Sequence, residues 1–206
     1  MGQRQRVTLL GILIVSLVLA GLAGTPGTAR AAAGALGAVP ATKIVSFHPS
    51  GTPTQVVNGN CGMGESLALD RADAWRCMVG NEIYDPCFSD APHATSVICD
   101  ATPMKPTGIR VKLSAPLPTH GHTQGKQAWI LELGDGTICG FLTGATGGVA
   151  DQRLNYGCTA DTYVIGDPQP VGKVWYATEV TVGSQFTSQG PKPLHIFAIS
   201  IATIWK

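Results

Sequence analysis

Residues 128–142 run AWILELGDGTICGFL and place two apolar stretches on either side of Gly134-Asp135-Gly136. In the first stretch Trp129, Leu131 and Leu133 occupy alternate positions, so they fall on one face of an extended strand. Asp-Gly between two such stretches is a strong hairpin signal, because both residue types accept the left-handed backbone conformation of tight turns. The segment therefore predicts two antiparallel strands joined by a short turn.

Similar short apolar or alternating stretches occur on both sides of this hairpin, separated by turn residues. We expect strands near residues 44–47, 82–84, 96–99, 109–113, 154–158, 162–165, 173–182 and 194–205. The last one, LHIFAISIATIW, is nearly all apolar, which is typical of a central strand covered on both faces.

One segment has a different pattern. Residues 68–79, ALDRADAWRCMV, are followed by Gly80 and predict a short helix with a glycine just past its end. The sequence thus predicts a mainly β (α+β) fold, an antiparallel sandwich or open barrel of about eight strands with one short helix packed at residues 68–79.

The N-terminal segment has the layout of a secretory signal peptide. Arg4 and Arg6 precede an unbroken apolar stretch over residues 7–24, and small residues lead up to Ala31. We expect a signal peptide over 1–31, a flexible lead-in over 32–42 and a single mainly-β domain over 43–206. An uncleaved membrane anchor is the alternative, because the apolar stretch nearly reaches the length that spans a bilayer. The expected location is secreted or extracytoplasmic.

The charge balance argues against a nucleic-acid partner. The formal net charge is +1, and loss of residues 1–31 with their three arginines leaves 11 basic and 13 acidic residues, a formal −2. The remaining basic residues are scattered singly, so no basic patch of the kind that binds nucleic acid is present in the sequence. Membrane contact is expected only through the N-terminal segment.

All six cysteines lie beyond the predicted signal peptide, namely Cys61, Cys77, Cys87, Cys99, Cys139 and Cys158. An even number of cysteines in an exported chain predicts disulfides, although sequence alone does not choose among the connectivities. We favour pairing in sequence order (61–77, 87–99, 139–158), because each pair brackets a short segment that contains turn residues. A structural zinc site is the alternative, but the chain has no C-x2-C pair, so we assign no metal ligands and no cofactor.

No complete catalytic set is visible. Residues 64–68, GESLA, approach the nucleophile elbow GxSxG, but Ala68 stands where the second glycine belongs and the preceding VVNGNC is a poor strand. We therefore expect Ser66 to cap the predicted helix, with no catalytic residues assigned.

Two groups of side chains are candidates for binding. His120 and His122 are two residues apart and would project to one side of an extended segment, where they could share a metal. A third ligand would have to come from His93, Asp90 or Asp100, and the surrounding prolines and glycines favour an exposed loop instead. The four tryptophans fit either core packing or a ligand groove. The candidate binding residues are Trp129, Trp175, His120 and His122.

Two stretches of the sequence are specific enough to be compared with a known family. They are RADAWRCMVGNEIYDPCF at residues 71–88 and WILELGDGTICGFLTGATGGVADQRLNYGC at residues 129–158. Over residues 61–180 the chain resembles a family of uncharacterised exported proteins of actinobacteria and related bacteria. The resemblance implies secretion and a cysteine-braced fold, and it brings no assigned reaction. The chain departs from the family at Gly62, because the first cysteine of the family is usually followed by tryptophan.

These observations predict an exported, disulfide-stabilised, non-catalytic domain that binds a ligand or partner at the cell envelope or outside the cell. Two alternatives stay open. One is a secreted hydrolase that acts on cell-wall or extracellular polymer, and the other is a metal-binding exported protein.

Overall fold

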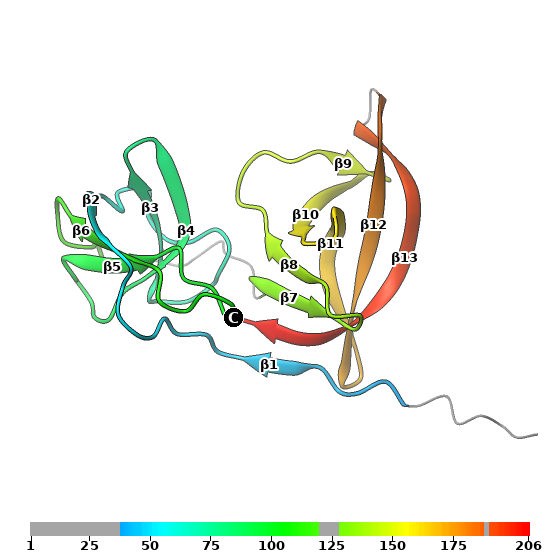
Figure 1. Cartoon of the computed structure of the whole chain (residues 1–206), viewed down its shortest axis with the longest axis horizontal. Helices are drawn as coiled ribbons and strands as arrows, with labels where there is room; N and C mark the ends of the chain where they lie inside the picture. Colours follow the sequence, from blue (N-terminus) through cyan, green and yellow to red (C-terminus); the bar gives the residue numbers. More distant parts are fainter. Residues whose placement is uncertain (1–37, 120–127, 188–189) are drawn as a thin grey trace, which may run out of the picture. The chain divides into compact units, whose positions relative to one another are not determined.

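The structure, a computed structural model, describes residues 38–119, 128–187 and 190–206, and these form two β-sheets (Figure 1). The larger sheet contains β1 (Lys43–Val45), β7 (Ile130–Leu133), β8 (Ile138–Phe141), β9 (Gly148–Val149), β10 (Gln152–Cys158), β11 (Thr162–Val171), β12 (Val174–Thr187) and β13 (Gly190–Trp205). The smaller sheet contains β2 (Val56–Gly59), β3 (Ala74–Val79), β4 (Glu82–Phe88), β5 (Ser96–Cys99) and β6 (Ile109–Leu113). The described residues contain no helix that could span a membrane.

Six strands of the larger sheet close on themselves. The order β7-β8-β10-β11-β12-β13 is antiparallel throughout, and β13 returns to pair with β7, with Trp205 opposite Ile130. Figure 1 shows β12 and β13 as long neighbouring strands on one side of this barrel. A cluster of buried residues unites the barrel strands: Leu131, Leu133, Cys139, Tyr156, Val164, Ala177, Ile201 and Ile204, together with Ala128.

The smaller sheet has the strand order β2-β6-β5-β4-β3, and disulfide-bonded cysteines lie in its core. Cys77, Cys87 and Cys99 are each 0% exposed, and they belong to one cluster with Trp75, Val97, Val111 and other apolar residues. Its strands are four to seven residues long, so no strand contributes many ladder hydrogen bonds. Covalent links therefore carry a large share of the stability of this sheet.

Disulfides join Cys61 to Cys77, Cys87 to Cys99 and Cys139 to Cys158. This is the pairing in sequence order. The first two lie in the smaller sheet, whereas the third joins β8 to β10 at residues that are already opposite each other in the ladder. The prediction of a mainly β, disulfide-braced fold is confirmed.

The helix predicted at residues 68–79 is wrong. Residues 74–79 form β3, which pairs with β4 so that Val79 lies opposite Glu82. Gly80 has the left-handed conformation expected of it, with a φ of 61°, but it opens a two-residue hairpin turn instead of ending a helix. Of the apolar residues that suggested a helical face, Trp75 and Cys77 are buried in the core of the smaller sheet, where the disulfide to Cys61 fastens Cys77. Ala74 is buried as well.

The structure also differs from two expectations about strands, one at residues 56–59 and one at the last strand. Residues 56–59, within the stretch that looked like a poor strand, form β2, because parallel pairing with β6 supplies the backbone partners that the sequence pattern does not reveal. The last strand is not covered on both faces. Leu194, His195, Ile196, Phe197 and Ala198 are all exposed, whereas the buried residues of β13 are Pro191 at its start and Ile201, Thr203 and Ile204 near its end.

An aromatic cluster connects β4 of the smaller sheet with the segment after β1 and the residue before β7. Phe47, Phe88 and Trp129 pack with ring centroids 5.5 to 5.7 Å apart. Arg71 lies over the Phe88 ring, and its guanidinium donates hydrogen bonds to the backbone carbonyls of Phe47 and Lys206. This residue therefore connects the segment after β1, the smaller sheet and the segment after β13.

Candidate functional site

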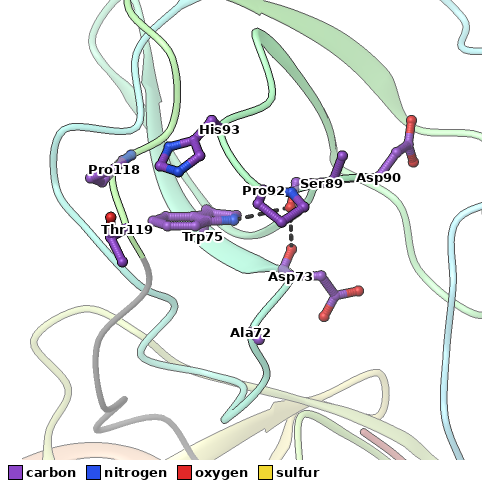
Figure 2. Close-up of a pocket in the computed structure, with 10 residues that line it drawn as sticks. Ala72, Asp73, Trp75, Ser89, Asp90, Pro92, His93, Pro118 and Thr119 are labelled. Atoms are coloured by element: carbon purple, nitrogen blue, oxygen red, sulfur yellow. Dashed lines mark hydrogen bonds between the residues drawn. The ribbon is translucent and has the colours of Figure 1, made fainter.

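A pocket of about 300 Å³ opens on the smaller sheet, a size at the lower end of small-ligand sites (Figure 2). Its walls come from β3 and from the two loops that follow β4 and β6. Half of the lining residues are apolar, and one of these is a tryptophan whose indole lies at the centre of the group. The lining residues are Ala72, Asp73, Trp75, Ser89, Asp90, Ala91, Pro92, His93, Pro118 and Thr119.

Trp75 supplies the aromatic surface of the pocket. Its indole Nε1 donates a hydrogen bond to the Ser89 hydroxyl at 3.2 Å, so the only polar group of the ring is already satisfied within the protein. The residue is 3% exposed and is held from behind by the disulfide-rich cluster. The indole therefore offers carbon atoms, and not a hydrogen-bond donor, to a molecule in the pocket.

His93 lies beside the indole in Figure 2, on the loop after β4. Its φ is 53°, an uncommon backbone conformation for a residue with a side chain. Its Nδ1 lies 3.1 Å from the carbonyl oxygen of Leu117. Because a carbonyl only accepts, Nδ1 carries the hydrogen, and Nε2 of the neutral ring is an acceptor for a ligand donor.

The two loops around the pocket are tied to each other and to β3. The Leu117 amide donates to the Ala94 carbonyl at 3.0 Å, and the Ser89 amide donates to the Asp73 carbonyl at 2.9 Å. In Figure 2 the carboxylates of Asp73 and Asp90 point away from the indole, and the Asp73 carboxylate is paired with Arg71. The interior of the pocket is therefore apolar, with the acidic groups turned outward.

Ser66 is placed in a turn and not in a catalytic arrangement. Its side chain is fully buried, its hydroxyl donates to Asp85 Oδ1, and it accepts the amides of Ala68 and Leu69 at 3.1 and 3.0 Å. It caps a turn, as its residue type favours, although the helix that it was expected to cap does not form. A hydroxyl that is buried and bonded in this way is out of reach of a substrate.

Asp85 completes this buried polar group. Its Oδ2 accepts the Leu67 amide at 3.0 Å and lies 3.9 Å from Arg76 Nε, and its side chain is 1% exposed. Burial raises the pKa of Asp85 above its ordinary value, while the Ser66 hydroxyl, the Leu67 amide and Arg76 act in the opposite direction. The arrangement braces the loop between β2 and β3.

The candidate residues from the sequence lie elsewhere. Trp129 is 6% exposed and belongs to the aromatic cluster, and Trp175 is partly buried against the barrel interior. Neither lines the pocket. His120 and His122 lie outside the described residues. The sulfur atoms of Cys77, Cys87 and Cys99 lie within 4.8 Å of one another, but all three are in disulfides and cannot act as thiolate ligands.

Sequence analysis did not place His93, Pro92 and Pro118 in one pocket, and it considered His93 only as a further metal ligand beside His120 and His122. The only signal for the pocket was the occurrence of proline in two loops, Asp90-Ala91-Pro92-His93 and residues 115–118 (APLP). Nothing in the pattern showed that the two loops meet over Trp75, because that contact depends on the pairing of β4, β5 and β6.

Comparison of the chain with protein-family models, with curated proteins and with solved structures finds no match.

Proposed function

We propose that this chain is an exported, non-catalytic binding domain, and that the pocket around Trp75 receives a single apolar ring from a peptide ligand, such as a proline or phenylalanine side chain. The observation that carries the proposal is the pocket itself, an aromatic floor with proline walls and one uncommitted acceptor, His93 Nε2. The three disulfides support an extracytoplasmic setting, because such bonds form and persist in oxidising compartments.

The polarity of the pocket favours a peptide ring over a sugar. A sugar ring needs several donors and acceptors around its hydroxyls, whereas here the indole N–H is used by Ser89 and both carboxylates face outward. A proline or phenylalanine ring needs none of these, and the amide next to it can donate to His93 Nε2. Rigid aromatic and proline surfaces also cost little conformational entropy on binding.

Indole N–H signals in protein NMR test this proposal. The four tryptophans give four indole signals, and Trp75→Phe identifies the one from the pocket. Titration with N-acetylproline methylamide or N-acetylphenylalanine methylamide is expected to shift the Trp75 signal saturably, with a Kd on the order of millimolar because the probes are small. The Trp129 signal is the internal control and should stay in place.

Methyl β-glucoside serves as the matched polar probe and should leave all four signals unchanged. A saturable shift with the glucoside but not with the two amides would overturn the choice of ligand. Equal shifts of all four indole signals, or no shift with either amide, would overturn the pocket as a binding site.

A further inference from the structure

The first half of β13 is the most apolar exposed segment of the described chain. Leu194 is 57% exposed, and Ile196 and Phe197 are each 46% exposed. His195 and Ala198 between and beside them are exposed as well. Because consecutive residues of a strand point to opposite faces, exposure of all five means that both faces of the strand are uncovered here.

The same segment also has a free edge. Residues 193–199 pair with β12 on one edge. On the other edge, the Gly134 amide donates to the Ser200 carbonyl at 2.7 Å, and the pairing of β13 with β7 and β1 begins at Ile201 and Thr203 respectively. Among the described residues, no strand pairs with the second edge of residues 193–199. An uncovered edge of this kind presents unpaired backbone donors and acceptors to any strand of matching chemistry.

We infer that this edge, residues 193–199 of β13, is the site where a second copy of the chain adds its own β13 in antiparallel orientation. A molecule that lies on one face would leave the other face exposed, whereas a strand added in the plane of the sheet brings side chains to both faces at once. The pairing is isologous, so the same edge of each copy is used and the contact closes at two chains.

The lack of charge on this edge favours a second copy of the chain over a charged partner strand. Residues 193–205 contain no Asp, Glu, Lys or Arg, so two copies of the edge meet without any opposed like charges. The net charge of the chain is also small, formally +1 with the N-terminal segment and −2 without residues 1–31, so two copies are not held apart at long range. An edge without charges gives a strongly acidic or basic partner strand no counter-charge.

The register follows from side-chain size. Antiparallel pairing centred on Ile196 places Ile196 opposite its copy, Leu194 opposite Ala198 and His195 opposite Phe197. Large residues then face small ones, and the imidazole faces a phenyl ring, which is a favourable cross-strand combination. The pairing ends at residues 193 and 199, because Gly134 already occupies the position beside Ser200. Lys192 of each copy therefore lies outside the paired segment.

Charged substitutions of Ile196, which lies opposite its own copy in this register, test the proposed dimer directly. We expect the wild-type chain to be a dimer by sedimentation equilibrium, and Ile196→Lys and Ile196→Glu each to raise the dimer Kd by about tenfold or more, since identical charges then oppose each other. An equimolar mixture of the two variants should recover the dimer. Val171→Lys is the matched control, because Val171 is 64% exposed at the turn between β11 and β12 and the variant should remain dimeric.

A wild-type chain that stays monomeric at several hundred micromolar would overturn the proposal, as would an Ile196→Lys variant as dimeric as the wild type or a mixture that stays monomeric. If either variant fails to fold by near-ultraviolet circular dichroism, hydrogen exchange of the wild type decides the question. Amides of residues 193–199 should gain protection with rising protein concentration, while those of residues 171–174 should not. Protection that is independent of concentration would contradict the inference.

Discussion

The smaller sheet and the closed larger sheet reach stability by different means. The smaller sheet has five short strands, two disulfides whose sulfurs cluster in its core, and a pocket on its surface. The larger sheet has strands of up to 16 residues, closes on itself through β13 and has one disulfide between strands that are already paired. The difference indicates that covalent bonds hold the smaller sheet and its pocket in shape, whereas hydrophobic burial holds the barrel.

Removal of the disulfides gives the largest expected difference between the two sheets. Replacing Cys61, Cys77, Cys87 and Cys99 by alanine should remove about 6 kcal/mol in the chain-entropy model and unfold the smaller sheet, since each bond closes a loop of 12 or 16 residues. Replacing Cys139 and Cys158 should cost about 3 kcal/mol and leave both sheets folded. Urea unfolding and limited proteolysis measure both. If the barrel of the first variant unfolds at a lower urea concentration than its smaller sheet, the smaller sheet does not depend on its disulfides more than the barrel does.

Two glycines, one next to each sheet, allow the effect of a single substitution on stability to be compared. Gly108 has a φ of 54°, and a Cβ there would lie 2.3 Å from the Cys99 carbonyl oxygen, whereas Gly136 has a φ of 89° with open space around it. Gly108→Ala should therefore destabilise the chain by about 3 kcal/mol or more, because backbone strain adds to the collision. Gly136→Ala carries only the strain, about 1 kcal/mol. Equal losses in urea unfolding would contradict this account.

Asp85 gives the smaller sheet a dependence on pH. Since burial raises its folded-state pKa, its contribution to stability is full below the unfolded value of 3.8 and is lost as pH rises through the folded value. Asp85→Asn removes this step and costs about 2 kcal/mol, because an NH2 donor replaces one of the two oxygens that accept from Ser66 and Leu67, and one of these donors then loses its acceptor. In urea unfolding, the stability of the wild type relative to the variant should fall as the pH rises from 3.8 through the folded pKa, and level off above it. A constant difference across pH would refute the role of burial.

The smallest expected effect lies in the barrel. The Tyr156 hydroxyl donates to the Ala128 carbonyl at 2.8 Å in the buried interior, and burial raises the pKa of Tyr156 above its ordinary range. Tyr156→Phe should cost about 1 kcal/mol, because the ring stays packed and one buried carbonyl loses its partner. The urea midpoint should move slightly at unchanged slope. If Tyr156→Phe lowers the free energy of unfolding as much as Gly108→Ala does, the barrel depends strongly on this single hydrogen bond, and this would contradict the account of a barrel held by hydrophobic burial.

The strands with local signals were predictable. The hairpin around Gly134-Asp135-Gly136 appears as β7 and β8, and residues 96–99 and 109–113 appear with the expected bounds. The cysteine pairing also follows the favoured order. In each case the determining interaction lies within about 20 residues of sequence, where turn chemistry and strand alternation act.

The features that depend on distant partners were not predictable. Residues 74–79 show helical spacing of apolar residues, yet the disulfide and the pairing with β4 make them a strand. The pocket was missed because His93 and Pro118 come together only through the pairing of other strands. The apolar character of residues 194–205 predicted that the whole strand is buried, but the first half of this segment is exposed. An apolar sequence shows that a strand could be buried, and it does not show whether another part of the chain packs against it.

The parallel pairing of β1 with the end of β13 has a consequence for the order of assembly. The hydroxyl of Thr42 donates to the carbonyl of Ile201, across 159 positions of sequence, and Lys43 lies opposite Thr203. Contacts of such high contact order form late, because the entropy of closing a long loop opposes them until the rest of the structure is in place. Completion of the fold should therefore take milliseconds to seconds, and docking of β1 should be among its last steps.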